Sequence, residues 1–485
     1  MTLSSALNNA LSGLNVASRA TDVIASNISN ATTPGYARRT LEVSATSGNL
    51  VGGATVTGVI RHSDPALLAS RREAEADLGY ATAINSFMTN LESALGTADD
   101  PGAITNLIAD LDARLLEASS RPDATERHAA VVNAANSLIT AINTTSDEIS
   151  QMRSEADASI DAQVTRLNAA LQEVEELNGK IAGLNISNED DSSLIDLRQQ
   201  VIDEINEIVP VTEAQRDYGG VALYTDAGLI LIDGAAREIS FDSVNLVTPE
   251  MTLEDGNLSG LTMGDLTLRT GSANSSVPGG TLAAQFEIRD ELGTSAHEQL
   301  DAFARDLIER FQDPAVDPTL AAGDPGLFTD GGFAFDPADE VGIASRISLN
   351  AAVDPAQGGE SWRLRDGLNA VTSGPVGQAS LLNTLRATLS VENTPASGSF
   401  GTGAFSLPEL ASSLLSQVGV DRLSSEQSLS FASATYFEMS QAENAAGVDT
   451  DQELQQLMLM EQAYSANARM LQVVSEMMDT LMEIG

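Results

Sequence analysis

The chain has 485 residues, enough for several domains around a substantial buried core, with 69 acidic against 25 basic side chains and a formal net charge of −44. So acidic a chain repels nucleic-acid phosphates and anionic lipid headgroups, and neither nucleic acid nor a membrane is expected as a partner. The sequence contains no cysteine, which excludes disulfides, thiolate metal sites and cysteine nucleophiles.

Residues 3 to 28 form the first predicted element, a helix of the coiled-coil kind. A mostly apolar seam repeats every seven residues, the spacing at which one face of a helix meets a partner helix. The two slots of the seam hold Leu7, Leu14, Thr21 and Ile28, and Leu3, Ala10, Ala17 and Ile24.

This helix is expected to end near residue 30. The side chains of Asn27 and Asn30 compete for backbone hydrogen bonds, and Pro34 cannot continue a helix. Pro34 and Gly35 are predicted to be the central residues of a tight turn, because proline presets the first dihedral angle and glycine accepts a positive one. Tyr36 is expected to pack against the base of a helical bundle.

The stretch from residue 37 to residue 61 is predicted to form short strands or an extended connector, because apolar and small residues alternate between glycines. It begins with Arg38 and Arg39. In a chain this acidic, these two arginines are expected either to pair with a neighbouring subunit or to face the solvent.

Most of the next 150 residues carry helical patterns. Three helices are predicted between residues 65 and 150, followed by a long rod-like helix over 152–185, where apolar residues recur at steps of three or four. Another amphipathic helix, over 194–208, ends ahead of Pro210. Together these segments predict an elongated helical bundle.

Beyond Pro210, short apolar runs alternate with glycine and aspartate turns, which predicts a β-rich insertion over 212–278. Helix returns over 282–311, and a second section of strands and loops follows over 313–375. Helices resume near residue 378, with one predicted over 409–446. Both β-rich insertions are expected at the end of the molecule farthest from the termini.

The C-terminal residues repeat the heptad pattern of the N-terminal helix. The two slots of this second seam hold Leu457, Tyr464, Leu471 and Met478, and Met460, Val474 and Leu481. Asn467 interrupts it, either as a polar residue that sets the register or as a tolerated edge position. Because uncovered apolar seams are sticky, the two ends are expected to pack against each other or against a neighbour.

No group of residues in the sequence points to catalysis or to a metal site. His62, His128 and His297 are far apart and lack the spacing of metal ligands, so each is interpreted as a surface or hydrogen-bonded histidine. The acidic run at 189–191 lacks the alternating oxygen donors and the glycine of a calcium loop. No GxSxG, Walker or dinucleotide-binding pattern occurs, so neither a cofactor nor an enzymatic activity is predicted.

The sequence also lacks a membrane-spanning pattern. No window approaches the roughly 20 consecutive apolar residues that cross a bilayer. The N-terminal residues lack the basic start, dense apolar block and cleavage site of a signal peptide. Export of the chain would therefore need a secretion pathway that recognises another signal.

Two stretches at opposite ends of the chain carry a family resemblance. Residues 447–454 and 461–469 resemble the C-terminal signature of the axial proteins of bacterial flagella, the rod, hook and first hook-associated proteins. Residues 25–36 resemble the N-terminal signature of the same family, through Asn27, Asn30, Thr33, Pro34, Gly35 and Tyr36. Matched signatures at both ends are far more specific than either alone.

The helical block over 65–209, and the stretch 279–282 ahead of another helix, resemble the hook–filament junction type within this family. The resemblance covers most of 1–310 and 425–485 and fades in the β-rich sections. It implies a non-catalytic subunit that connects hook and filament by polymerising through its terminal helices. The expected assembly seam is Leu7, Leu14, Ile24, Ile28, Leu457, Tyr464, Leu471, Val474, Met478 and Leu481.

The resemblance also implies partners and a location. The implied partners are further copies of the chain in a ring, the hook protein, a second junction protein of the hook-associated protein 3 type, and a cytoplasmic export chaperone that covers residues 454–484. The implied location is extracellular, in the flagellum, reached through the flagellar export apparatus.

The expected fold is mainly α with β insertions, elongated and multidomain. Residues 1–60 and 447–485 are expected to form a terminal assembly domain. A helical bundle is expected from 61–211, 279–312 and 376–446, and a distal β-rich domain from 212–278 and 313–375. Two alternatives remain: another axial protein of the hook or rod type, or a secreted adhesin or enzyme carried on a flagellar scaffold.

Overall fold

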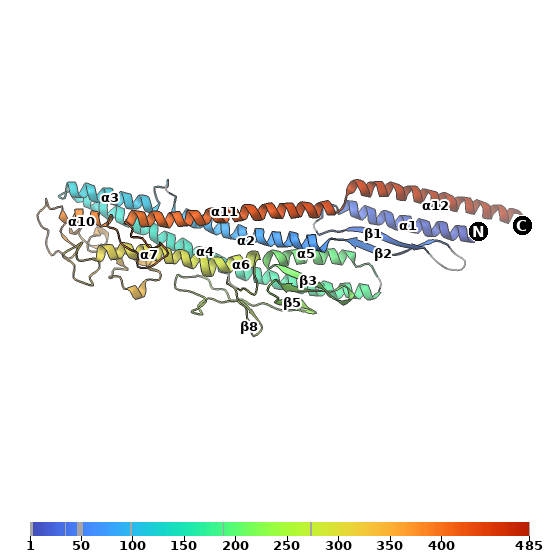
Figure 1. Cartoon of the computed structure of the whole chain (residues 1–485), viewed down its shortest axis with the longest axis horizontal. Helices are drawn as coiled ribbons and strands as arrows, with labels where there is room; N and C mark the ends of the chain where they lie inside the picture. Colours follow the sequence, from blue (N-terminus) through green and yellow to red (C-terminus); the bar gives the residue numbers. More distant parts are fainter. Residues whose placement is uncertain are drawn as a thin grey trace.

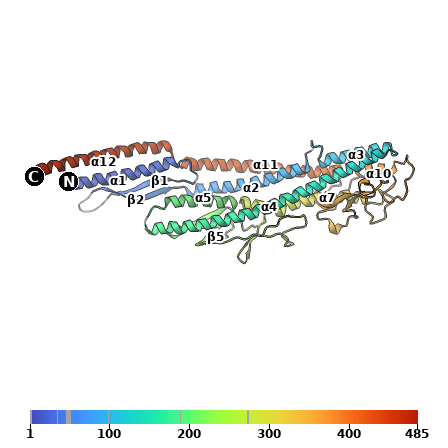
Figure 2. The same cartoon turned by 180° about the vertical axis from the view of Figure 1, so that it is seen from behind.

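The computed structural model describes residues 3–33, 35–45, 52–97, 99–187, 189–271 and 274–484. They form an elongated molecule in which long helices run lengthwise and both termini lie at one end (Figure 1). The reverse view shows the same order of elements along the length (Figure 2). The predicted fold class, mainly α with β insertions, is confirmed. None of the helices in the described part of the chain is long and apolar enough to cross a membrane.

Helices α1 (Leu3–Ser29) and α12 (Thr450–Ile484) lie side by side at the end that holds both termini (Figure 1). We call this pair the terminal coil. The antiparallel hairpin of β1 (Arg38–Ala45) and β2 (Ala54–His62) runs beside it. The predicted N-terminal helix, the extended stretch and the packing of the two chain ends are confirmed, although residues 46–51 of that stretch lie outside the described residues.

The body is built around two long antiparallel helices, α2 (Pro65–Leu95) and α11 (Leu407–Ala446), which pack along each other (Figure 1). Asp64 caps α2, because its carboxylate accepts hydrogen bonds from two backbone N–H groups of the first turn at 3.0 and 3.2 Å. Helix α11 begins with a capping box between Ser406 and Glu409. Local capping chemistry therefore sets where both helices begin.

Helix α4 (Thr125–Ser187) has 63 residues and runs along most of the body (Figure 2). It packs against α3 (Ile104–Ser120) and, farther along, against α5 (Ser192–Ile208). The prediction of a separate helix over 152–185 is wrong, because that stretch continues the preceding helix without a break. No proline or glycine interrupts α4 before Gly179, and apolar residues on one face are buried along its whole length.

The first of two hydrophobic cores lies between the second half of α4, α5, α6 and a four-stranded antiparallel sheet in the order β3-β4-β5-β6. A small hairpin, β7 and β8, adds to it. The β-rich insertion predicted after Pro210 is thus confirmed. Its strands are β3 (Val211–Gln215), β4 (Val221–Thr225), β5 (Ile230–Asp233), β6 (Ala235–Ala236), β7 (Thr262–Met263) and β8 (Leu266–Thr267).

The second core lies at the end farthest from the termini, between α3, the first half of α4, α7, α10 and the adjoining parts of α2 and α11. The segment 313–375 belongs to it. The helices and strands from residue 280 to residue 388 are α6 (Gly280–Glu287), α7 (Gly293–Gln312), β9 (Phe328–Asp330), α8 (Ile343–Arg346), β10 (Ile347–Leu349), α9 (Arg363–Asp366) and α10 (Ser380–Thr388).

The expectation that both β-rich insertions lie at the far end is wrong for 212–278. This segment lies midway along the body, beside α4 and α5 (Figure 1). Its apolar strand residues cover the second half of α4, which would otherwise be exposed. The two insertions therefore belong to different cores.

Two buried arginines lie where the two cores meet, next to the π-helical turn Ile288–Leu292 between α6 and α7. Arg289 pairs with Asp157 of α4 at 2.7 Å and with Asp290 at 2.7 Å. Arg153 of α4 donates to the Arg289 carbonyl at 2.9 Å and to two carbonyls of the β-rich insertion at 2.8 and 3.2 Å. Because each of these buried charges has hydrogen-bond partners, they hold the two cores in a fixed arrangement.

His297 of α7 should make the body sensitive to acid. Burial, and then the nearby charge of Arg153, lower the pKa of His297 to about 3, and its side chain is 2 % exposed. The unfolded chain binds a proton near pH 6.5 and the folded chain does not, so stability is lost as the pH falls from 6.5 towards 3. Between pH 8 and pH 5 this group alone should lower the free energy of unfolding by about 2 kcal/mol.

The measurement is the free energy of unfolding of the wild type and of His297→Gln at both pH values. The difference between the two proteins at pH 8 reports packing, which serves as the internal control. Because glutamine does not titrate, the advantage of the wild type should shrink by about 2 kcal/mol at pH 5. If the difference in unfolding free energy between the wild type and His297→Gln is the same at both pH values, His297 is not the acid-sensitive group.

Candidate assembly interface

Asn27, near the end of α1, is completely buried. Both polar atoms of its side-chain amide have hydrogen-bond partners. Its Oδ1 accepts hydrogen bonds from the Tyr36 hydroxyl at 2.8 Å and from the Arg39 N–H at 3.0 Å. Its Nδ2 donates to the Arg39 carbonyl at 2.8 Å and to Glu453 Oε2 at 3.0 Å. A buried amide with all its partners in place fixes the positions of α1, β1 and α12 relative to one another.

Glu453 brings the C-terminal signature to this point. Gly447 ends α11, and Asp449 caps α12 by accepting hydrogen bonds from two N–H groups of its first turn at 3.0 and 3.1 Å. Glu453 lies one turn into α12, and its other oxygen accepts from Arg38 Nε at 2.7 Å. Residues of the two signatures, 426 positions apart in sequence, thus form one buried hydrogen bond.

Glu453 belongs to the C-terminal signature, but its role was not predicted from the sequence. A signal was present: Glu453 falls in the heptad slot that also holds Met460, Asn467 and Val474, where a carboxylate is out of place unless a polar partner faces it. Asn27 is that partner.

The remaining signature residues shape the turn that follows α1. Asn30 Nδ2 donates to a carbonyl one turn earlier at 2.9 Å, and the Thr33 hydroxyl lies 3.4 Å from Asn30 Oδ1. Gly35 has a φ of 73°, the positive value that the sequence predicted for it. The Tyr36 N–H donates to the Thr33 carbonyl at 3.2 Å. Pro34 lies outside the described residues.

Tyr36 and the two following arginines bind within the chain. Tyr36 points to Asn27 and lies under the guanidinium of Arg39, 4.9 Å from the ring centroid. Arg39 pairs with Asp196 of α5, which Arg61 of β2 also binds at 2.7 Å. The expectation that Arg38 and Arg39 face the solvent or a neighbouring subunit is therefore wrong, because both have carboxylate partners inside the chain.

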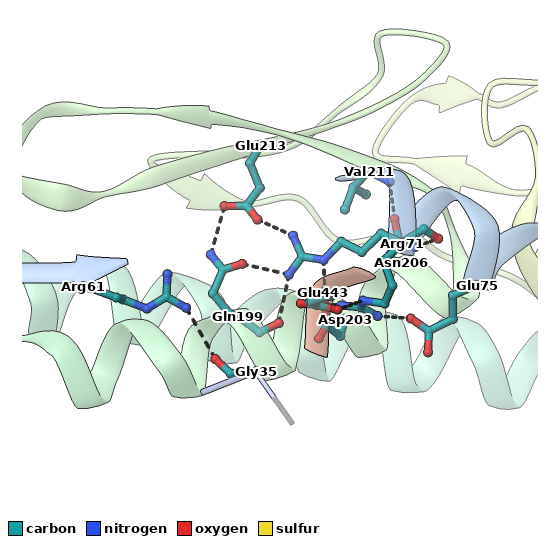
Figure 3. A network of polar contacts seen from close by, with 11 residues as sticks. Gly35, Arg61, Arg71, Glu75, Gln199, Asp203, Asn206, Val211, Glu213 and Glu443 are labelled. Carbon is teal, nitrogen blue, oxygen red and sulfur yellow. Dashed lines mark hydrogen bonds and ion pairs between the residues drawn. The ribbon is translucent and has the colours of Figure 1, made fainter. Parts of the chain in front are cut away.

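A second set of ion pairs joins α2 to α5 and to the end of α11 (Figure 3). Arg71 binds Asp203 at 2.7 Å and Glu443 at 2.9 Å, and also pairs with Glu75. Burial raises the pKa of Glu75, and the charge of Arg71 partly offsets this. Arg72 adds contacts to Asp203, Gln199 and Glu213. These contacts hold three helices of the body together where the body meets the terminal coil.

The structure places the residues of the expected assembly seam at three levels of exposure. Ile24 and Val474 are buried. The half-buried members are Leu7, Leu14, Ile28, Leu457 and Leu471, and the exposed members are Tyr464, Met478 and Leu481. Their role in assembly stays a prediction.

Asn467 lies against Gly13, and this contact fixes how closely α1 and α12 approach. A Cβ atom at Gly13 would stand only 2.7 Å from Asn467 Nδ2, so no larger residue fits without a shift. Asn27 faces Glu453 and Gly13 faces Asn467, which makes the two helices antiparallel.

Much apolar surface of the terminal coil has no partner among the described residues. The exposed large apolar side chains of the coil are Leu11, Leu454, Met458, Leu459, Tyr464, Met470, Val473, Met477, Met478, Leu481 and Met482. An exposed apolar patch of this kind marks an interaction surface. Within the described residues, no group of three His, Asp or Glu side chains could hold a metal ion.

Replacing Asn27 by aspartate should loosen the coil. Aspartate keeps the shape and still accepts from Tyr36 and Arg39, but it puts a second negative oxygen 3.0 Å from Glu453 in place of a donor. Leaving buried groups unpaired in this way costs about 2–3 kcal/mol. Amide hydrogen exchange over residues 450–460 should therefore speed up by at least about tenfold. The matched control is Asn15→Asp, at an exposed position of the same helix. Equal amide exchange rates over residues 450–460 in the two variants would show that the Asn27–Glu453 contact does not hold α12 in place.

Family models match three parts of the chain. "Flagellar hook-associated protein FlgK helical domain" matches residues 88–318. "Flagella basal body rod protein" matches residues 7–36, and "Flagellar basal body rod FlgEFG protein C-terminal" matches residues 439–484. The two shorter matches contain the signatures that meet at Asn27 and Glu453.

Similar proteins from several bacteria carry the name flagellar hook-associated protein 1. The protein of Escherichia coli K12 is 23% identical over 558 aligned residues, which cover 99% of this chain and 100% of that protein. The protein of Bacillus subtilis 168 is 21% identical, covering 98% of this chain and 96% of that protein. The Salmonella typhimurium LT2 protein is 26% identical over 53% of this chain and 51% of its own length.

Among solved structures, the flagellar hook junction protein FlgK from Burkholderia pseudomallei is similar, with a TM-score of 0.45 and 17% identity over 56% of this chain and 47% of that chain. The Escherichia coli and Bacillus subtilis relatives extend over nearly the whole chain, and the family models fall on its two ends and its helical body in the expected order. The chain is therefore similar, over nearly its whole length, to the flagellar hook-associated protein 1 family of flagellar axial proteins.

Proposed function

We propose that this chain is a structural subunit of the bacterial flagellum at the hook–filament junction, and that it polymerises through its terminal coil. The observation that carries the proposal is the buried contact between Asn27 and Glu453. It joins the two chain ends into one unit, and the outer side of that unit leaves apolar side chains uncovered.

Polymerisation would stabilise the assembly by covering these side chains. Fully burying one leucine or methionine side chain contributes about 1.5–3 kcal/mol. The exposed members of the expected seam, Tyr464, Met478 and Leu481, would be covered by neighbouring subunits in this way. The ordered body, attached through the contacts of Arg39 and Arg61 with Asp196, would then be carried at a fixed angle to the coil.

The neighbours follow from the family. Copies of the chain would form a ring, with the hook protein on one side and a second junction protein of the hook-associated protein 3 type on the other. Before assembly, a cytoplasmic chaperone would cover residues 454–484, and the chain would leave the cell through the flagellar export apparatus. We assign it no enzymatic activity; the buried carboxylates near the coil, Glu453, Asp196 and Asp203, are each held by arginines in structural contacts.

The domain division also stands as a proposal. Residues 1–60 and 447–485 would form the assembly domain, and 61–211, 279–312 and 376–446 the helical bundle. Residues 212–278 and 313–375 would be its two β-rich insertions, one in each core of the body.

Removing residues 454–485 should abolish motility and leave hooks without filaments, because the truncated chain lacks most of α12. Electron microscopy of the strain should show hooks that persist, with flagellin shed into the medium. The purified truncated chain should still unfold cooperatively, since both cores of the body are intact.

Val371→Ser is the matched control, because Val371 is highly exposed but lies in the far-end segment away from the coil. This strain should swim normally. Filaments that stay attached to cells expressing the truncated chain would contradict the proposal.

A further inference from the structure

A cavity of about 70 Å³ lies in the second core of the body, where α2, α4, α7 and α11 meet. Its inner wall consists of buried apolar side chains: Met88, Leu91, Leu95, Ile149, Leu300 and Leu414. Water gains little against such a wall, because a water molecule in a protein needs two to four polar partners. The inner part of the cavity therefore suits an apolar group.

Small residues at the start of α7 keep the cavity open. Ser295 and Ala296 line the side that faces α2 and α11, and neither side chain is long enough to fill the space between the helices. Unfilled apolar volume costs stability in a close-packed core. An apolar cavity with a few polar groups at its entrance is the usual form of a small-molecule site.

The mouth of the cavity is polar and carries a negative charge. Its rim includes Ser295, Gln417 and Asp421, which are all exposed. Among the residues that the structure describes, no basic side chain forms an ion pair with Asp421. The adjacent Arg422 is held by Glu92 and Glu426, each at 2.8 Å. The mouth therefore attracts a cation.

We propose that this cavity binds a small primary ammonium ion with a short alkyl chain, for which n-butylammonium is the probe. The alkyl chain lies against Leu91, Leu300 and Leu414, and the ammonium group stays at the mouth beside Asp421. An apolar cavity of roughly 150 Å³ binds benzene. One of about 70 Å³ suits a chain of three or four carbons.

The order of the apolar and charged parts selects a free small molecule over a side chain of another protein. A lysine side chain would enter with its ammonium group first and would place the charge against the apolar wall, which is costly without a partner. An aliphatic side chain would fill the cavity but would gain nothing from Asp421. An alkylammonium ion uses both features, since its chain is buried while its charge remains in water.

The inference is independent of the proposed function. The cavity lies between helices of the body, whereas polymerisation is proposed for the terminal coil at the end that holds both termini (Figure 1). Failure of either proposal therefore leaves the other in place.

Nuclear magnetic resonance of the full chain with ¹³C-labelled methionine methyl groups tests the site. The signal of Met88 should shift as n-butylammonium is added and should saturate, with a dissociation constant of about 5 mM or lower. Met458 is the control within the same molecule, because it is 57 % exposed on α12, and its signal should not move.

Two changes test the role of the charge. n-Butanol has the same chain without the charge and should bind at least about threefold more weakly, a factor typical of an exposed ion pair. Asp421→Asn should weaken the binding of n-butylammonium by the same factor and leave that of n-butanol unchanged. Glu438→Gln is the matched control, since this exposed carboxylate lies about 25 Å farther along α11, beyond the screening distance.

Ala296→Leu tests the location. The added side chain should occupy the cavity and abolish the shift of the Met88 signal by n-butylammonium. The melting temperature of this variant should equal or exceed that of the wild type, because the new side chain fills empty apolar volume. If Ala296→Leu does not fold, Asp421→Asn still decides, since its substitution is at an exposed position.

Each other result overturns the proposal. Shifts that do not saturate, or that are equally large at Met458, would mean non-specific association. Equal affinities for n-butanol and n-butylammonium, or an unchanged affinity in Asp421→Asn, would mean that Asp421 does not recognise the ammonium group. Binding that persists in a folded Ala296→Leu variant would place the ligand outside the cavity.

Discussion

The whole arrangement depends on one buried side-chain amide. Asn27 satisfies a carboxylate, a hydroxyl and both polar groups of one backbone residue, and so holds three elements from the two ends of the chain. A buried polar centre of this kind is costly when incomplete and specific when complete, because an apolar seam alone would tolerate sliding. Glu453 thus sets the register that Gly13 and Asn467 maintain farther along the coil.

The coil and the body are stabilised by different means. The body has two hydrophobic cores along α4, joined by the buried pairs of Arg153 and Arg289. The coil has few fully buried side chains and is attached through the β1–β2 hairpin, whose Arg38 binds Glu453 and whose Arg39 and Arg61 bind Asp196. The body is well packed, and the coil leaves apolar side chains exposed. This arrangement suits the proposed assembly, in which neighbouring subunits would bury those side chains.

The acidity of the chain extends over the coil as well as the body. Helices α1 and α12 together hold seven acidic and two basic residues, so like charges oppose the close approach of two copies at both parts. Several large apolar side chains of α12 stay exposed beside these charges.

The sequence by itself determined what depends on neighbouring residues: the end of α1 near Asn30, the positive φ of Gly35, the start of α11, the β-rich insertion after Pro210 and the heptad repeats. Periodicity also located the apolar faces, but it could not say which face meets which partner. Only the tertiary structure decided that Arg38 pairs with Glu453, that 212–278 lies midway along the body, and which members of the α12 seam are buried and which are exposed. These outcomes depend on contacts between residues hundreds of positions apart, which local patterns do not record.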